Sequence, residues 1–567
     1  MNEKIAVYVA WPYANGDLHL GHIAGAYLPA DIFARFHRLA GDDVMMVSGS
    51  DSHGTPITLK AKQQKISPKE LVENYHQRFI EDFQALGISF DLFTNTLTKN
   101  HYKIVTDFFK KFEENGDFTI ESQPQFYDTV ENVFLPDRYV GGKCPLCSYE
   151  KARGDECEQC GKTYEVTAIK DPISSLSGTT PVLKDTEHFF LHLENYQDQL
   201  REYVDKSTHW KSHVKNFTSS WVEEGLRPRA VTRDIDWGIP VPKAGWEDKV
   251  IYVWFDAVIG YLSASKEYSA LVKNEDLWKD WWCDKTSKSF YFIGKDNIPF
   301  HTVIWPIELM AYDKSYNLPY DVPANHFLNI EGEKFSTSRG HAVWVRELLE
   351  KLSPDALRFY VSSILPETKD SNFSWEELKT RNNGELVAAW GNLVNRVLGF
   401  CQSKFEGVIP TPGKLSELDE AILARREAVF KSVAASYSTC MFREALKDSL
   451  ALAREVNKYL DERAPWTLFK TNPEDAGTVI YVALTMIRSI NILMAPIIPN
   501  SAEKIEGLLG DSRKLFAAPK MEKVGENEDE HLVLFADRVK NSDLFEPCGV
   551  QSGSKLEKIE PLFKLLE

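Results

Sequence analysis

Short apolar runs with helical segments between them constrain the fold of this chain most strongly. Ile5 to Ala10 and Val44 to Val47 read as buried strands, and segments with helical spacing alternate with them up to about Phe112. Strand-like runs resume at Val250 to Phe255 and at Phe290 to Ile293. Alternating strands and helices are typical of an α/β fold with a doubly wound parallel sheet. The pattern therefore predicts one such sheet whose two halves are separated by an insertion.

The last third of the chain follows a helical pattern. Apolar residues recur at steps of three and four along residues 442–460, which predicts an amphipathic helix that faces a bundle. A second long helical segment runs from Ala476 to Leu493, and we expect no strand after Lys379. The sheet is therefore expected to be followed by an all-α helical bundle.

Two short motifs suggest phosphate chemistry. The sequence HLGH at residues 19–22 stands between the first strand and a segment with helical spacing over residues 23–39. Unpaired N–H groups and the helix dipole favour anions at such a turn, and two imidazoles add hydrogen-bond donors. The sequence KFSTS at residues 334–338 sets Lys334 beside hydroxyl groups, in a cationic loop suited to the far end of a triphosphate. Because parallel strands end at one edge, a split sheet brings both motifs into one cleft.

Four of the eight cysteines have the spacing of a metal site. They form two Cys-x2-Cys pairs, and each pair makes a tight turn that aims two thiolates at one ion: Cys144, Cys147, Cys157 and Cys160. Four thiolates fill the tetrahedral shell of Zn²⁺ and leave no position for water or substrate. We therefore expect one structural zinc ion. The alternative of two disulfides conflicts with the cytoplasmic setting that the remaining sequence suggests.

Composition narrows the class of protein further. The 567 residues are 43% hydrophobic, and the formal net charge of −17 argues against a generally basic nucleic-acid coat, although not against a local basic face. We find no segment of roughly eighteen uncharged apolar residues, and the apolar start lacks a basic lead-in and a cleavage site. The remaining cysteines are scattered singly. A cytoplasmic protein without a membrane partner is therefore expected.

The two motifs together resemble the signatures of class I aminoacyl-tRNA synthetases, which read His-Ile-Gly-His and Lys-Met-Ser-Lys-Ser. Leu20 and Phe335 are mild variants of that pattern. Thr337 is the main departure, because it puts a hydroxyl where the family usually has a second lysine. This leaves Lys334 as the main cation, and we hypothesise that Arg339 restores part of the lost charge.

Longer strings resemble the methionyl-tRNA synthetase family, in family order along essentially the whole chain. They occupy residues 10–16, 49–56, 135–140, 237–240, 254–257 and 293–297. The insertion is roughly a hundred residues long. A resemblance to the valine, isoleucine or leucine enzymes would imply a much larger editing domain at this place, so those three are disfavoured. The cysteine enzyme would need an open zinc position, whereas this site looks closed.

The resemblance implies a reaction and its partners. L-Methionine would attack the α-phosphorus of ATP to give methionyl-adenylate and pyrophosphate, and the methionyl group would then pass to tRNA(Met). His19, His22 and Lys334, with Mg²⁺ bound to ATP, would stabilise the transition state. The implied ATP-binding residues are Gly21, Gly294, Asp296, Ser336, Thr337 and Ser338.

The resemblance also implies a substrate pocket and an anticodon site. Asp51 would meet the ammonium group of methionine, and aromatic rings would contact its thioether. Arg233 would point into the cleft, where it would meet the substrate carboxylate or phosphate; the alternative is an ordinary surface ion pair. The implied methionine-binding residues are Ala10, Tyr13, Asp51, Trp254, Ala257, Tyr261 and His301. Those implied for the anticodon are Asn392, Arg396 and Trp466.

These inferences divide the chain into five segments. They are the first half of a Rossmann-like catalytic domain (1–115), a connective insertion with the zinc knuckle (116–230), the second half of the catalytic domain (231–325), a connecting domain with the KFSTS loop (326–380) and an α-helical anticodon-binding domain (381–567). No appended β-barrel is expected, so we predict a monomer. Two rival interpretations stay open. The first is a different class I synthetase or a simple nucleotidyltransferase. The second is a non-catalytic RNA-binding or scaffold protein descended from a synthetase.

Overall fold

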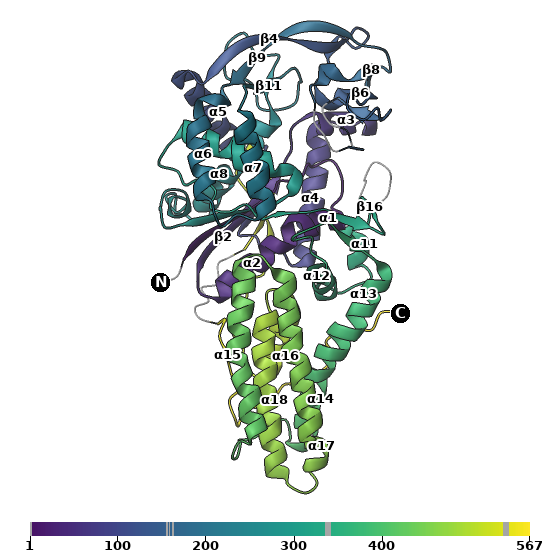
Figure 1. Cartoon of the computed structure of the whole chain (residues 1–567), viewed down its shortest axis with the longest axis vertical. Helices are drawn as coiled ribbons and strands as arrows, with labels where there is room; N and C mark the ends of the chain where they lie inside the picture. The colour runs from purple at the N-terminus through teal and green to yellow at the C-terminus, as the bar shows by residue number, and fades with distance from the viewer. Residues whose placement is uncertain (1–2, 155–156, 158, 161–163, 335–341, 537–543) are drawn as a thin grey trace.

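A seven-stranded sheet lies at the centre of the computed structural model, which describes residues 3–154, 157, 159–160, 164–334, 342–536 and 544–567. The molecule is elongated, with the insertion at one end, the sheet in the middle and a helical bundle at the other end (Figure 1). The strand order is β14-β13-β1-β2-β3-β19-β18. Their bounds are Ala324–Asn325, Lys288–Gly294, Lys4–Val9, Asp43–Ser50, Leu92–Asn95, His531–Phe535 and Lys520–Val524.

The first five strands of that order are parallel, which confirms the predicted doubly wound sheet. Ile5 in β1 pairs with Val44 in β2 on one side and with Lys288 in β13 on the other. The chain proceeds from β1 to β2 and β3, and after the insertion it returns to β13 and β14 on the opposite side of β1. This reversal beside β1 is a topological switch point, where open α/β sheets bind ligands.

Both faces of the sheet are buried, which explains why its strands are continuously apolar. Val7 packs into one core with α2 (Leu28–Leu39) and α4 (Pro68–Leu86), whereas Tyr8 packs into a second core with α5 (Lys99–Asn115), α8 (Val253–Leu271) and α10 (Trp305–Tyr312). The predicted helix over residues 23–39 is present. Its first turns, Ile23–Tyr27, are π-helical.

The described residues of the insertion form two antiparallel sheets and two α-helices. The larger sheet has the order β10-β9-β4-β5, and the smaller one, which carries the cysteines, has the order β7-β6-β8. The strands of the larger sheet are Arg229–Ala230, Val182–Leu191, Phe118–Asp128 and Val133–Phe134, and those of the smaller sheet are Ala152–Arg153, Val140–Lys143 and Lys170–Ser174. Helices α6 (Gln197–Lys206) and α7 (Ser212–Glu224) follow.

A small three-stranded sheet links the catalytic region to the bundle. Its order is β16 (Glu333–Lys334), β15 (Leu328–Ile330) and β17 (Ser371–Phe373). Helices α11 (Val345–Leu349), α12 (Pro354–Ser363) and α13 (Trp375–Arg381) lie between this sheet and the bundle (Figure 1). A π-helical stretch over Asn382–Gly391 joins α13 directly to α14 (Asn392–Lys404).

The bundle confirms both predicted long helices. They are α16 (Phe442–Arg463) and α18 (Pro473–Met494), and they pack with α15 (Glu417–Ser438), α17 (Pro465–Leu468) and α19 (Pro499–Leu508). Of the described residues, α18 alone forms a helix that is long and apolar enough to cross a membrane, and 89% of its apolar window is buried inside the protein. Its hydrophobicity is therefore explained by its place as a core helix of the bundle.

Two expectations about strands were wrong. The chain does form strands after Lys379, because β18 and β19 return to the central sheet and β19 pairs antiparallel with β3. The bundle segment is therefore not wholly helical. The run Val250 to Phe255 is also not one strand, since it is divided between β12 (Val250–Ile251) and α8, which begins at Val253. Apolar residues in a fully buried helix resemble a strand over a few positions.

Candidate active site

The carboxyl ends of β1 and β2 form the floor of the candidate site. The chain leaving β1 is bridged to the residue that follows β2, because the Asp51 N–H donates to the Pro12 carbonyl and the Ala14 N–H donates to the Asp51 carbonyl, both at 2.8 Å. Tyr13 and Asp51 thus lie side by side at the switch point. Trp11 packs between Gly49 and Gly260, where added Cβ atoms would come within 2.2 and 2.8 Å of its ring.

The two histidines of the HLGH turn are stacked. Their ring centroids are 3.7 Å apart at an angle of 22°, and the His19 N–H donates to His22 Nδ1 at 3.2 Å. Burial lowers the pKa of His22 to about 4, and burial followed by the proximity of His22 lowers the pKa of His19 well below its usual value. Both rings are therefore neutral at pH 7 and offer N–H donors at the start of a helix.

The chain on both sides of the KFSTS motif lies beside this turn or in the adjoining small sheet. The Leu20 N–H donates to the Val343 carbonyl at 2.9 Å, and the Val345 N–H donates to the Leu18 carbonyl at 3.1 Å. Lys334 pairs through its backbone with Asn329 in β15. Residues 335–341, which include Ser336, Thr337, Ser338 and Arg339, lie outside the described residues, so the roles expected for them stay predictions.

The residues expected to bind the methionine side chain come from three separated segments of the chain, and four of them form two contacting pairs. The Tyr13 and Trp254 rings meet edge to face with centroids 6.2 Å apart. The Tyr261 hydroxyl and His301 Nε2 are 2.7 Å apart, and both side chains are buried. Ala257 is buried on α8. The carbonyl of Ala10 accepts a hydrogen bond from the Tyr27 hydroxyl, which belongs to the helical segment after the HLGH turn.

The Asp51 carboxylate is buried and close to a second carboxylate. Its exposed fraction is 3%, and the His53 N–H donates to Asp51 Oδ1 at 3.1 Å. Burial, and secondarily the charge of Asp256, raises the pKa of Asp51 well above its usual value. A cation placed against this carboxylate would favour its ionised form.

Asp296 and Arg233 lie at the edge of the site in different environments. Asp296 is exposed in a single turn after β13, and a Cβ on Gly294 would come within 2.7 Å of its Oδ1, so the glycine lets the carboxylate fold back. Arg233 stacks over the Tyr252 ring at 3.6 Å and donates to two backbone carbonyls. Asp234 pairs with His188, at 3.1 Å, and with Lys249, the residue that precedes Val250.

The four cysteines of the insertion come together as predicted. Their sulfur atoms all lie within 4.8 Å of one another, and the thiols form no disulfide. The N–H groups of Leu146 and Cys147 point at Cys144 Sγ, each at 3.4 Å. Desolvation raises the pKa of Cys144, but the N–H donors, led by that of Cys147, outweigh it and lower the pKa to about 6. This set of donors fits the thiolate shell of a zinc ion.

Two of the three residues expected to read the anticodon are in contact at the far end of the bundle. The Arg396 guanidinium lies over the Trp466 ring, 4.9 Å from its centroid, and Phe400 meets the same ring edge to face at 5.1 Å. Asn392 is exposed one turn before Arg396 on α14. The indole is partly exposed, so one part of its ring is available to a stacked base.

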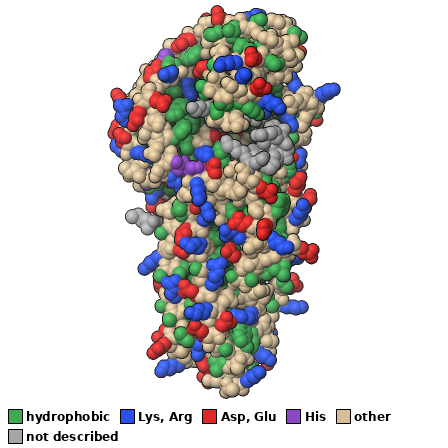
Figure 2. All heavy atoms as spheres, turned by 45° about the vertical axis from the view of Figure 1, so that its right-hand side comes forward, with side chains coloured by type: hydrophobic (Ala, Val, Ile, Leu, Met, Phe, Trp, Pro, Cys, Tyr) green, Lys and Arg blue, Asp and Glu red, His purple; other side chains and the backbone are tan. Residues whose placement is uncertain are grey.

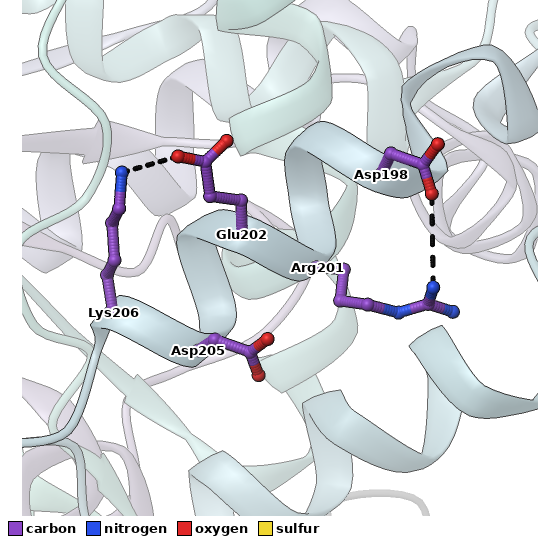
Figure 3. Close-up of a pocket in the computed structure, with 5 residues that line it drawn as sticks. All are labelled: Asp198, Arg201, Glu202, Asp205 and Lys206. Carbon is purple, nitrogen blue, oxygen red and sulfur yellow. Dashed lines mark hydrogen bonds and ion pairs between the residues drawn. The ribbon is translucent and has the colours of Figure 1, made fainter.

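Other charged regions of the surface look like ordinary solvated faces. Figure 3 shows an open hollow on α6, where the pairs Asp198–Arg201 and Glu202–Lys206 lie within one helix at 3.9 and 2.6 Å. Figure 2 shows basic and acidic side chains interspersed over the bundle. Pairs of this kind contribute little and do not by themselves mark a ligand site.

Sequence reasoning missed several residues of the site. Phe300 stacks on Trp254 with centroids 3.9 Å apart, and Trp344 bridges to His19 through the backbone. His53 and Asp256 adjoin Asp51. Phe300 directly precedes His301, and Asp256 stands inside the string 254–257, so their positions next to expected residues were the available signals.

Comparisons with known proteins identify the family of the chain. A family model described as tRNA synthetases class I (M) matches residues 5–398, and one described as the anticodon binding domain of methionyl tRNA ligase matches residues 409–530. The chain is 48% identical to the methionine--tRNA ligase of Thermomicrobium roseum over 568 residues, covering 100% of this chain and 97% of the relative. It is 46% identical to that of Roseiflexus castenholzii, with the same coverage.

Solved structures share the fold. A Mycobacterium tuberculosis methionyl-tRNA synthetase bound by methionyl-adenylate superposes with a TM-score of 0.79 at 24% identity, covering 100% of both chains. A second structure from that organism, in complex with methionyl-adenylate, has a TM-score of 0.79 at 25% identity and covers 99% of this chain. With full-length relatives and both family models in agreement, this chain belongs to the methionyl group of the class I tRNA synthetases.

Proposed function

We propose that this protein is a methionine--tRNA ligase, which activates L-methionine with ATP and transfers the methionyl group to tRNA(Met). Two observations carry the proposal: Tyr13 and Asp51 are bridged at the switch point of the sheet, and the two histidines are stacked at the start of the helix that follows β1. The family of the chain supports the same reaction. The site therefore combines an anion for an ammonium group with donors for a phosphoryl group.

The chemistry needs positioning and charge stabilisation but no protein nucleophile. The methionine carboxylate attacks the α-phosphorus of ATP, the bond to the β-phosphate oxygen breaks, and pyrophosphate leaves. Neutral His19 and His22 donate N–H groups to phosphate oxygens, and Lys334 stabilises the departing pyrophosphate. Mg²⁺ bound to ATP supplies further charge neutralisation.

The pocket explains a preference for a thioether side chain. Tyr13, Trp254 and Tyr261 offer aromatic surface to a polarizable sulfur atom, and each such contact contributes about 0.3–1.5 kcal/mol. The hydrogen bond between Tyr261 and His301 fixes both rings. Asp51 binds the substrate ammonium group, Asp296 binds the ribose of ATP, and Gly21 and Gly294 let the backbone approach the nucleotide.

Two further sites complete the proposal. Cys144, Cys147, Cys157 and Cys160 hold one structural zinc ion, a role supported by their four sulfur atoms, which all lie within 4.8 Å of one another. Asn392, Arg396 and Trp466 read the anticodon of the tRNA, supported by the contact between Arg396 and Trp466 and by the matching anticodon-binding domain. The division of the chain into five segments, a monomeric state and action in the cytoplasm stay predictions.

Amino-acid-dependent exchange of pyrophosphate into ATP tests the function directly. The purified protein is assayed with each of the twenty amino acids in Mg²⁺, without tRNA. Exchange with methionine alone is expected. Exchange with a different amino acid would move the pocket assignment, and folded protein without exchange would favour a non-catalytic RNA-binding role.

A further inference from the structure

The helical segment after the HLGH turn contains one wide turn. Its residues Ile23–Tyr27 are π-helical, and the Leu28 N–H donates to the carbonyl of Ile23, five residues back. A π-helical turn holds one residue more than an α-helical turn, and such turns are frequent at functional sites. Compared with a continuous α-helix, the extra residue rotates His19 and His22 by roughly 100° relative to α2.

Pro29, in the first turn of α2, accounts for the position of the wide turn. In an α-helix its ring would clash with the carbonyl four residues back, which is that of Gly25, and a π-helical turn avoids this clash. Proline also has no N–H group, and in a π-helix that group would serve the carbonyl five residues back, which is that of Ala24. The segment therefore lacks one helical donor at this place.

The side chain of Asn325 supplies a donor there. Its Nδ2 donates to the Gly25 carbonyl at 3.1 Å and to the Ala24 carbonyl at 3.4 Å. Only the amino group of the amide can donate to two carbonyl oxygens, so this contact fixes the orientation of the side chain. Asn325 is 3% exposed, and a buried carbonyl that loses its donor is costly. Because rotation of the segment would carry both carbonyls away from the amide, Asn325 holds the turn in this register.

The backbone of Asn325 connects the same residue to other parts of the proposed ATP site. In β14 it pairs with Gly294, the last residue of β13, which stands two residues before Asp296. The chain then runs from β14 through β15 to Lys334 in β16. One residue therefore contacts both the helical segment after the HLGH turn and the strand end that leads to Asp296.

We propose that Asn325 is a positioning residue for adenylate formation, which holds the π-helical turn so that His19 and His22 face the phosphates of ATP. Asn325 acts through the histidines and not by contact with the reacting atoms. This inference rests on the proposed function, since it assumes that the histidines donate to a phosphoryl group. It deepens that function by naming the residue that fixes their direction.

The test replaces Asn325 in the full chain with leucine, which has a similar branched shape but no hydrogen-bond donor. Single-turnover assays measure the rate of adenylate formation over a range of ATP concentrations. Isothermal titration calorimetry measures the dissociation constant of methionine and the fraction of the protein that binds it. Rates are then expressed per methionine-binding site, so that inactive protein does not lower them. If circular dichroism shows that Asn325→Leu does not fold, Asn325→Ala replaces it.

We expect the rate per site at saturating ATP to fall about tenfold, or about 1.4 kcal/mol in activation free energy, because the histidines then also adopt unproductive directions. The dissociation constant of methionine should stay within about twofold, since Trp254 and Tyr261 lie on α8 and Asp51 follows β2. Hydrogen exchange should also accelerate in a peptide that covers residues 19–28, because the π-helical turn opens more often.

A second buried asparagine provides a matched control. Asn491 on α18 is fully buried, and its Nδ2 donates to the Ala502 carbonyl at 3.0 Å and to Glu506 Oε1 at 2.9 Å. Asn491→Leu removes the same group from the contact between α18 and α19. It should lower the free energy of unfolding but leave the rate per site and the dissociation constant of methionine unchanged.

The outcomes separate the inference from the function on which it rests. A rate per site that falls no more in Asn325→Leu than in Asn491→Leu would overturn the role of Asn325. A loss of methionine binding as large as the loss of rate would also overturn it, because the residue would then support the whole site and not the histidines. If the original protein forms no adenylate with methionine, the proposed function itself is wrong, and the inference fails with it.

Discussion

Replacing Arg358 with leucine should weaken the junction between the catalytic sheet and the helical bundle. Arg358 on α12 is fully buried, and its Nε donates to the Ile497 carbonyl at 2.8 Å. Its Nη2 donates to the Pro496 carbonyl at 2.9 Å and to Asp31 Oδ2 at 2.6 Å. Asp31 lies on α2, which continues the helical segment after the HLGH turn, whereas Pro496 and Ile497 connect α18 to α19. One guanidinium therefore bridges both parts of the molecule.

The contacts set the size of the effect. Removing one partner of a buried ion pair costs about 3–5 kcal/mol. Asp31 keeps Arg35 at 2.8 Å and the Ser89 N–H at 2.7 Å, which reduces the cost. Three backbone carbonyls, those of Ile497, Pro496 and, at 3.5 Å, Leu86, lose a charged donor, which increases the cost by about 1–3 kcal/mol. We therefore expect a loss of about 4 kcal/mol, or roughly a thousandfold in a local opening equilibrium.

Hydrogen exchange measured by mass spectrometry resolves this loss locally. Exchange should accelerate in peptides from α2 and from the junction of α18 with α19, because local opening exposes their amides. Arg425→Leu is the control, since its pair with Glu455 is 2.9 Å long but largely exposed and contributes less than about 1 kcal/mol. The control variant Arg425→Leu should change the exchange rate by less than tenfold. If Arg358→Leu also changes it by less than tenfold, the guanidinium does not hold the junction.

Four further predictions follow from the site and its supports. Lys334→Ala should lower the rate of adenylate formation about 10²-fold in single-turnover assays while leaving methionine affinity unchanged, and equal losses in both would count against its role. Trp466→Ala should spare pyrophosphate exchange but weaken tRNA charging about tenfold, the effect of one lost base stack, and unchanged charging would refute the assignment. Removing the metal with a chelator, or the substitution Cys147→Ser, should speed hydrogen exchange across residues 140–174 but not in α16. If elemental analysis finds no zinc in the purified protein, the proposed zinc site is wrong. Burial lowers the pKa of His22 and His301 from 6.5 to about 4, so the unfolded chain binds more protons than the folded one between these pH values. The free energy of unfolding should therefore fall as the pH drops from 6.5 to 4. His301→Gln should reduce this dependence on pH, measured by denaturation curves at several pH values.

The parts of the fold that sequence predicted well are those with dense local signals. β1, β2 and β13 are apolar at successive positions because a parallel sheet covered on both faces has no solvent side. The cysteine cluster was predicted because two Cys-x2-Cys turns define a metal site by spacing alone. In these regions the residues that determine the structure are close together in the sequence.

The missed elements depend on contacts between distant segments. β18 is largely exposed and charged, so its sequence, KMEKV, reads as a loop, and its strand state comes from the pairing of β18 with β19 and of β19 with β3. His53 and Asp256 are 203 residues apart, and only the return of the chain to the sheet brings α8 against the end of β2. No local pattern marks such a pair.

The bundle sets the distance between the two ends of the proposed tRNA interaction. The first turn of α16 lies against the connecting segment that follows α12, where the Arg443 N–H donates to the buried carboxylate of Glu367 at 3.0 Å. The 22 residues of α16 then extend roughly 33 Å to the segment that carries Trp466. One apolar core runs from β1 into α16, so the helix is packed rather than hinged on the sheet. If one RNA contacts both Trp466 and the His19 turn, as proposed, it must therefore reach from the far end of the bundle to the sheet.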